Sequence, residues 1–165
     1  LILSTGGMSV GEEDHVKPAV LAEGTLDLWQ IAMKPGKPLA FGQVRREAGQ
    51  GEAAFIGLPG NPVSSFVTFL LFVRPYLLAL QGVTQVAPTA LPVRAAFDWP
   101  RPDKRREYLR VRLNAQGEAE LFPSQNSAVL TSTVWADGLV DNPPQQTIQR
   151  GDMLRFLPFS SLLQG

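Results

Sequence analysis

Two strand–loop–helix junctions in the first half of the chain constrain its fold more than any other feature of the sequence. In the first, the apolar residues 1–3 lead into the glycine-rich loop STGGMSVG, residues 4–11, and then into a helix that ends before Gly24. In the second, the apolar strand of residues 53–58 leads through GLPGNPVS into a helix over residues 63–80. Strands that alternate with helices in this way predict an α/β unit.

A predicted pair of strands lies between the two junctions. The stretches Thr25–Met33 and Leu39–Val44 read as strands, and the turn KPGKP, residues 34–38, joins them. The polar residues 45–52 are expected to form an exposed loop. We expect the helix of the first junction to begin near Asp14, which would act as its N-cap.

The second half of the chain has a different pattern. Residues 84–92 are rich in Pro and Thr and carry no charge, which is typical of a linker. After them, the alternation in REYLRVRL predicts a half-buried strand. The stretches AELFPS, VLTSTVWA and DMLRFLPF read as further short strands. The sequence therefore predicts an α/β unit over residues 1–83, a linker over 84–92 and a small antiparallel β unit, a barrel or a sandwich, over 93–165.

The composition excludes several classes of function. The 15 basic and 15 acidic residues balance, so the chain lacks the basic footprint of a nucleic-acid-binding protein. It has no cysteine, which excludes disulfides, iron–sulfur clusters and thiolate zinc sites and fits a cytosolic protein. The apolar segment 62–82 contains Arg74, and its unbroken apolar run covers only residues 69–73, so we expect a buried helix rather than a membrane span.

The first glycine-rich loop is a candidate anion site. A loop between a strand and a helix directs several backbone N–H groups toward one point, and the helix N-terminus adds partial positive charge. Hydroxyl donors are available from Ser4, Thr5 and Ser9. The loop matches neither the Walker pattern nor the dinucleotide pattern. The alternative is a plain strand-to-helix turn.

Three acidic residues, Glu12, Glu13 and Asp14, stand beside this candidate site. A carboxylate repels phosphate unless a cation lies between them, and Mg²⁺ binds well to one or two carboxylates together with substrate phosphates. The alternative is that the acidic side chains only favour the helix N-terminus, which we adopt for Glu13. Asp14 is retained as a candidate metal or water contact. His15, the single histidine, is expected to be a surface or packed residue.

Two further motifs could bind an anion. Lys34 and Lys37 lie across the KPGKP turn and could grip an oxyanion or a polyphosphate, although ordinary turns also contain lysine. In GLPGNPVS, Asn61 is a natural N-cap, and Ser64 adds a hydroxyl to the first helical turn. This junction is either a second anion site or only a well-formed helix start. The basic cluster RPDKRREYLR is interpreted as a solvated edge strand.

Three motifs together resemble one family. STGGMSVGEEDHVK, KPGKPLAFG and GLPGNPVSSFVTF, in this order and spacing, resemble the molybdopterin molybdenumtransferases, which include the bacterial MoeA type and the E domain of gephyrin. REYLRVRL and GDMLRFLPF are similar to strands of that family's last domain. The resemblance implies that residues 1–83 are the C-terminal half of a doubly wound α/β molybdopterin-binding domain, followed by a small β-barrel-like domain. The family's two N-terminal domains are absent, so we expect a fragment of a longer protein.

The resemblance implies a cytoplasmic enzyme of molybdenum cofactor biosynthesis that is dimeric in its full-length form. Members of the family take molybdate and adenylylated molybdopterin, use Mg²⁺, insert molybdenum at the dithiolene and release AMP. A molybdopterin adenylyltransferase is an expected partner, and neither nucleic acid nor a membrane is. Two alternatives stay open: a protein-binding scaffold of the gephyrin type, and adenylyltransferase activity, although the adenylyltransferases lack the β domain.

Site residues are implied by matching position. Asp14 would be catalytic and a ligand of the metal, near the pyrophosphate, while Lys34 and Lys37 would contact the anionic substrate or molybdate. Substrate binding is implied for Gly6, Gly7, Ser9 and Gly11 in the phosphate loop, for Gly60, Asn61, Pro62 and Ser64 in the nucleotide pocket, and for Ser127 near molybdate. The chain departs from the family pattern at two positions: Gln30 stands where many relatives carry Lys or Arg, and Asn126 replaces a usual Gly.

Overall fold

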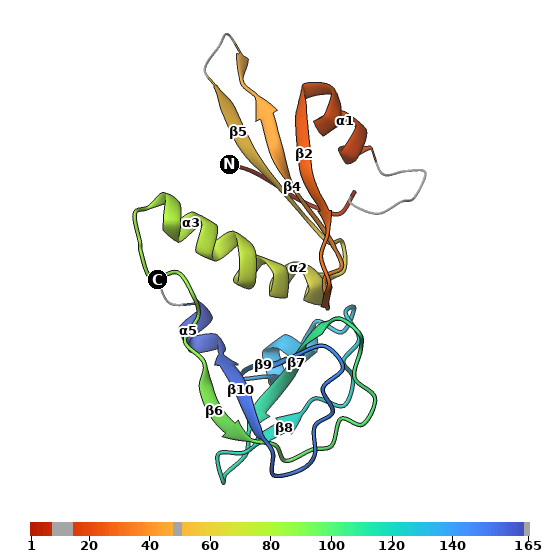
Figure 1. Ribbon diagram of the computed structural model, residues 1–165, viewed down its shortest axis with the longest axis vertical. Helices are drawn as coiled ribbons and strands as arrows, with labels where there is room; N and C mark the ends of the chain where they lie inside the picture. Colours follow the sequence, from red (N-terminus) through yellow and green to blue (C-terminus); the bar gives the residue numbers. More distant parts are fainter. Residues whose placement is uncertain (8–14, 48–50, 164–165) are drawn as a thin grey trace.

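The computed structural model describes residues 1–7, 15–47 and 51–163. It contains a four-stranded sheet and a six-stranded sheet, and one long helix lies between them (Figure 1). The predicted fold class, an α/β unit followed by a small β unit, is confirmed. The exact bounds of the two units and of the linker stay a prediction.

The first sheet has the strand order β1–β5–β4–β2. Its strands are β1 (Ile2–Thr5), β2 (Gly24–Gln30), β4 (Pro38–Arg45) and β5 (Glu52–Leu58). β1 and β5 are parallel, whereas β5, β4 and β2 are antiparallel. Helix α1 (Val16–Glu23) packs on this sheet because Val20 is buried with Ala40 and Phe55. The helix begins after His15, and its predicted N-cap, Asp14, lies outside the described residues.

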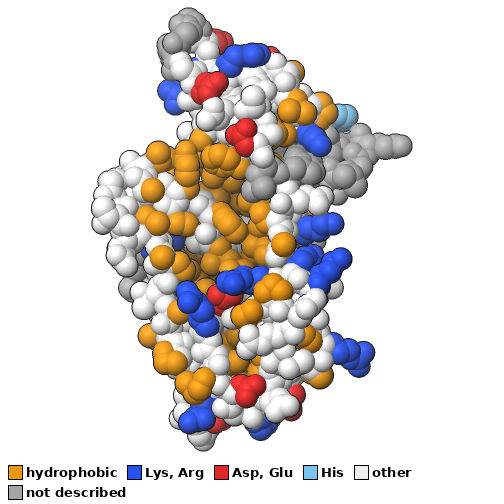
Figure 2. Space-filling view, in the orientation of Figure 1, with side chains coloured by type: hydrophobic (Ala, Val, Ile, Leu, Met, Phe, Trp, Pro, Cys, Tyr) orange, Lys and Arg blue, Asp and Glu red, His pale blue; other side chains and the backbone are white. Residues whose placement is uncertain are grey.

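β1 forms one edge of this sheet, and its apolar side chains remain exposed. Leu1, Ile2 and Leu3 are each exposed by 41–42%. Figure 2 shows further apolar side chains gathered across the middle of one face of the molecule. The strand start predicted from the three apolar residues is therefore correct, although its side chains are not buried within this chain.

The predicted single strand Thr25–Met33 is wrong in its last part. β2 ends at Gln30, and residues 33–34 form a short strand, β3 (Met33–Lys34), that belongs to the other sheet. β3 pairs in parallel with Arg106 and Glu107. Met33 is buried in the core beside the long helix, so the chain crosses from one sheet to the other to bury this side chain. The KPGKP turn consequently stands where the two sheets meet.

The long helix consists of α2 (Pro62–Thr68), the π-helical turn η2 (Phe69–Val73) and α3 (Arg74–Leu80). By length and composition alone it could cross a membrane. One side of it packs with the first sheet, where Val73 meets Leu39, Ile56 and Leu58. Another side packs with the second sheet through Val63, Val67 and Leu70. The helix thus joins the cores of the two sheets. The predicted burial holds for α2 and η2, whereas α3 contains no buried residue.

The second sheet has the order β3–β7–β9–β10–β6, with β8 paired to β7. Its remaining strands are β6 (Leu91–Arg94), β7 (Arg106–Leu113), β8 (Ala119–Leu121), β9 (Gly138–Asn142) and β10 (Met153–Pro158). The strands predicted from REYLRVRL, AELFPS and DMLRFLPF are present. A last short helix, α5 (Phe159–Leu163), returns to the long helix, where Phe159 and Phe66 meet edge to face with ring centroids 5.4 Å apart.

The strand predicted from VLTSTVWA is wrong, because residues 131–135 form helix α4 (Thr131–Trp135). Hydroxyl groups explain the difference. Ser132 Oγ donates to the Val129 carbonyl at 2.6 Å, and Thr133 Oγ1 donates to the Leu130 carbonyl at 2.7 Å. Such local bonds offer the backbone an alternative to a sheet ladder.

The basic cluster is also not a solvated edge strand. β7 lies between β3 and β9, and Arg110 on this strand is only 1% exposed. Both faces of the centre of β7 are therefore covered, rather than one face as the alternation predicted. The covering segments, helix α4 and residues 124–127, also form part of the site described below.

Candidate functional site

An open cleft of about 590 Å³ lies where the KPGKP turn, the start of α2 and residues 125–127 come together. Its lining contains Lys34, Pro35, Gly36, Lys37, Pro38, Pro59, Gly60, Asn61, Ser64, Arg105, Gln125, Asn126 and Ser127. Six residues chosen from the sequence, Lys34, Lys37, Gly60, Asn61, Ser64 and Ser127, are thus brought to one place. Pro62 does not line the cleft, but it begins α2 as predicted.

The first glycine-rich loop starts beside the second junction. The Gly6 N–H donates to the Leu58 carbonyl at 3.1 Å, and a β-carbon on Gly60 would lie 3.5 Å from Gly6 Cα. This proximity follows from the pairing of the parallel strands β1 and β5, whose carboxyl ends meet at one edge of the sheet. Gly7 instead packs on α1, since a β-carbon there would lie 2.4 Å from Val16 Cγ2.

The remaining residues predicted for that loop, Ser9, Gly11 and Asp14, lie outside the described residues. Their roles in phosphate and metal binding stay a prediction. Within residues 1–7, 15–47 and 51–163, no group of three or more His, Asp or Glu side chains could hold a metal ion.

The start of α2 is tied to the segment that contains Ser127. The Val63 N–H donates to the Ser127 carbonyl at 3.1 Å, and the Ser65 hydroxyl donates to the Pro59 carbonyl. Asn61 occupies the N-cap position as predicted, but its side chain makes no capping hydrogen bond. The amide of Asn61 therefore faces the cleft without a capping role, while one of the first N–H groups of the helix serves to hold the cleft wall together.

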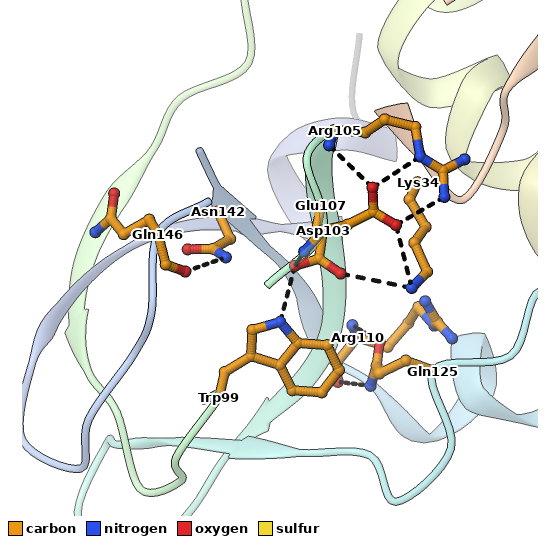
Figure 3. Close-up of polar contacts among 9 residues, drawn as sticks. All are labelled: Lys34, Trp99, Asp103, Arg105, Glu107, Arg110, Gln125, Asn142 and Gln146. Carbon is orange, nitrogen blue, oxygen red and sulfur yellow. Dashed lines mark hydrogen bonds and ion pairs between the residues drawn. The ribbon is translucent and has the colours of Figure 1, made fainter. Parts of the chain in front are cut away.

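Two cations of the cleft lining, Arg105 and Lys34, are held by carboxylates (Figure 3). Arg105 donates to both oxygens of Asp103, from Nε at 3.0 Å and from a terminal nitrogen at 2.8 Å. These hydrogen bonds keep the pKa of the Asp103 carboxyl well below its usual range and raise the pKa of Arg105. Lys34 Nζ lies 3.8 Å from Asp103 Oδ2 and 3.7 Å from Glu107 Oε1.

A second hollow of about 560 Å³ adjoins the cleft and shares Lys37 and Arg105 with it. Gln30 lines this hollow together with Lys104. Gln30 stands where many relatives were expected to carry Lys or Arg. In this chain the hollow beside it is lined by other basic side chains, those of Lys37, Lys104 and Arg105. No ion pair in the described part of the chain involves Lys37, so this ammonium group faces both hollows without a carboxylate partner.

Sequence reasoning missed Arg105 and Gln125, which line the cleft, and also Arg110, which anchors one of its walls. The Arg110 guanidinium donates to Ser132 Oγ at 3.3 Å and to the carbonyls of Ser124 at 3.4 Å and Asn126 at 3.2 Å. No carboxylate in the described residues pairs with it, and burial lowers its pKa to about 10. The side chain of Gln125 makes two hydrogen bonds with the backbone of Arg110. Its Oε1 accepts from the Arg110 N–H at 2.9 Å, and its Nε2 donates to the Arg110 carbonyl at 3.2 Å. Arg110 thus carries the segment 124–127 that lines the cleft.

The dependence of the free energy of unfolding on pH in the acid range should reveal the contribution of Asp103. Because the pKa of Asp103 is lowered in the folded state, its stabilising contribution is present above its ordinary value of 3.8 and is lost as the pH falls below it. We expect the difference in free energy of unfolding between the parent and Asp103→Asn to shrink between about pH 6 and about pH 3. Urea unfolding at several pH values measures it.

Asp141 provides a control of opposite sign. Burial raises the pKa of this carboxyl despite Arg106 at 3.2 Å and Arg155 at 3.3 Å. The folded state therefore takes up its proton at a higher pH than the unfolded chain does, so stability rises as the pH falls through that raised pKa. Relative to Asp141→Asn, the parent should gain stability on acidification. If the two differences change in the same direction on acidification, one of the two assignments is wrong.

Comparisons with known proteins agree with this architecture. Residues 1–79 match the probable molybdopterin binding domain, and residues 92–159 match the MoeA C-terminal region, domain IV. Two solved MoeA structures from Pyrococcus horikoshii superpose with TM-scores of 0.76 and 0.64, at 26% and 23% identity. The first superposition covers 96% of this chain and 37% of that structure, and the second covers 81% and 32%.

Curated relatives give the same answer. The molybdopterin molybdenumtransferase of Haemophilus influenzae is 34% identical over 99% of this chain and 40% of its own length. Gephyrin of Dictyostelium discoideum is 39% identical over 50% of this chain and 13% of its own length. The chain therefore spans about two fifths of the Haemophilus relative. Since both of its regions match the same kind of protein in the same order, the chain belongs to the MoeA-like molybdopterin molybdenumtransferase family.

Proposed function

We propose that the chain forms the oxyanion- and nucleotide-binding part of an enzyme that inserts molybdate into adenylylated molybdopterin and releases AMP. The observation that carries this proposal is the cleft in which Lys34, Lys37, Asn61, Ser64 and Ser127 converge. Molybdate is a tetrahedral dianion, and ammonium, hydroxyl and amide groups are the donors that bind such oxyanions. The names of the relatives support this choice among oxyanions.

The position of each group in the cleft suggests its role in binding or transfer. Lys34 and Lys37 would attract the oxyanion and neutralise charge that develops during transfer, while the donors of Asn61, Ser64 and Ser127 would orient it. The loop that begins at Gly6 would hold the phosphates next to the Gly60 backbone, with Gly7, Ser9 and Gly11 completing it. The second glycine of the junction, Gly60, allows the close approach, and Pro62 fixes the direction of α2.

Magnesium belongs to the same proposal. The described residues alone form no metal site, but Mg²⁺ commonly binds through one or two carboxylates and the phosphates of the substrate. Asp14 would supply the carboxylate, and the ion would neutralise phosphate charge as the anhydride is cleaved. We further propose a cytoplasmic protein whose full-length form is a homodimer and receives its substrate from a molybdopterin adenylyltransferase.

Removal of Lys37 tests the proposal. We expect the parent chain to bind molybdate in isothermal titration, and Lys37→Ala to weaken the binding by tenfold or more, because a hydrogen bond to a charged group contributes about 1.5–3 kcal/mol. Arg94→Ala is the matched control, since it removes one cation from β6 at the far edge of the second sheet. The proposal fails if the parent does not bind molybdate or if both variants weaken it equally.

A further inference from the structure

We propose that Glu107 is a positioning residue that fixes the ammonium group of Lys34 at the wall of the cleft. The inference rests on the proposed role of Lys34 in binding an oxyanion. Glu107 belongs to β7 and is 1% exposed, so it cannot itself reach a ligand in the cleft. Its place next to Lys34 is set by the backbone, since the two residues are register partners between β3 and β7.

The two oxygens of Glu107 have different neighbours (Figure 3). Oε2 accepts hydrogen bonds from Trp99 Nε1 at 2.8 Å and from the backbone N–H of Asp103 at 3.1 Å. Oε1 accepts no hydrogen bond from the part of the chain that the structure describes, and it lies 3.7 Å from Lys34 Nζ. Two uncharged donors therefore hold the carboxylate in place, and its second oxygen is directed at the lysine. A buried carboxylate held this way requires a nearby cation, and Lys34 supplies it.

The separation between Lys34 and its carboxylates leaves its donors available. Distances of 3.7 Å to Glu107 and 3.8 Å to Asp103 exceed those of a hydrogen bond but allow strong charge attraction. The Lys34 side chain is 42% exposed. A lysine on a flexible stem loses side-chain entropy when it orders around a ligand. Glu107 reduces this loss because it orders the ammonium group beforehand and leaves the N–H groups free for the oxyanion.

This role has a signature that a purely structural role lacks. A carboxylate near an anion site repels the anion, so Glu107 helps binding only through Lys34. Glu107→Gln should weaken molybdate binding about fivefold in the parent, as measured by isothermal titration. In the Lys34→Ala background the same substitution should strengthen the binding or leave it unchanged, because only the repulsion is then removed. Glu120→Gln, in the exposed pair with Arg112, is the matched control and should change neither affinity.

The outcomes separate the possibilities. Stronger binding by Glu107→Gln in the parent would show that Glu107 only repels the anion, and equal weakening in both backgrounds would show that it acts through the fold; either result overturns the inference. Failure of the parent to bind molybdate would reject the proposed function instead.

A second measurement tests the position of Lys34 without any ligand. The ¹³C signal of reductively methylated Lys34, identified by its loss in Lys34→Ala, should shift in Glu107→Gln and stay in place in Glu120→Gln. An unchanged signal would overturn the inference even if molybdate does not bind. If Glu107→Gln does not fold, Trp99→Phe removes one donor that orients the carboxylate and keeps its charge, and it should shift the same signal.

Discussion

Replacement of Arg110 by methionine is expected to lower the free energy of unfolding by about 3 kcal/mol and to abolish measurable molybdate binding. The guanidinium is buried and bonds the Ser132 hydroxyl and the carbonyls of Ser124 and Asn126. Methionine fills similar volume but donates no hydrogen bond, so the buried Ser132 hydroxyl and the two part-buried carbonyls would lose their donor. Urea unfolding gives the stability change.

The loss of binding would follow from the same contacts. Arg110 holds the segment 124–127, and the carbonyl of Ser127 in that segment is tied to the first turn of α2. When the anchor is removed, the side chains of Gln125, Asn126 and Ser127 no longer have a fixed place in the cleft. Lysine at position 110 keeps the charge but cannot reach three acceptors in one plane, so Arg110→Lys should recover only part of the stability.

Arg112→Met is the control on the same strand. Arg112 is exposed and pairs with Glu120 at 2.9 Å, and its guanidinium carbon lies 4.5 Å from the ring centroid of Trp135. Exposed ion pairs and cation–π contacts contribute about 1 kcal/mol or less each, so this variant should remain close to the parent. Equal destabilisation by the two substitutions would contradict the anchoring role of Arg110.

Local patterns were sufficient to predict much of this architecture. Asn61 and Pro62 mark the start of a helix by their own backbone preferences, and the parallel pairing of β1 with β5 then brings Gly6 next to Gly60. The alternation in REYLRVRL predicted β7. Neighbouring residues decide the helix start and the alternating strand, and the approach of Gly6 to Gly60 follows once the two strands pair in parallel.

Features that depend on distant contacts were not predicted. The alternation in β7 placed Arg110 on the face opposite Leu109 and Val111, and a face of arginines was interpreted as exposed. That face is covered by α4 and by residues 124–126, whose contacts with Arg110 span 14 to 22 residues of sequence, beyond the reach of any local pattern. Likewise, the crossing of β3 to the second sheet depends on the burial of Met33 against the long helix, which no periodicity within residues 25–33 reveals.

A side chain at position 36 should separate the two halves of the cleft. Gly36 lies between Lys34 and Lys37, in the left-handed region with φ of 115°. A β-carbon there would lie 2.5 Å from Thr68 Cγ2 on helix α2. Thr68 cannot easily move away, because it is fully buried and its hydroxyl donates to the Ser64 carbonyl at 2.7 Å. The KPGKP turn therefore packs against α2 only if residue 36 is glycine.

Gly36→Ala is accordingly expected to lower the free energy of unfolding by about 3 kcal/mol, through backbone strain and overpacking of about 1–3 kcal/mol each. Gly151→Ala isolates the first of these, since Gly151 has φ of 94° and no atom within 4 Å of its would-be β-carbon. It should cost about 1 kcal/mol.

Molybdate binding should fall at least tenfold in Gly36→Ala and remain unchanged in Gly151→Ala, because only the first substitution moves the two lysines away from Ser64. Equal stability losses without any loss of binding would show that the turn does not need its contact with α2 to hold the lysines in the cleft.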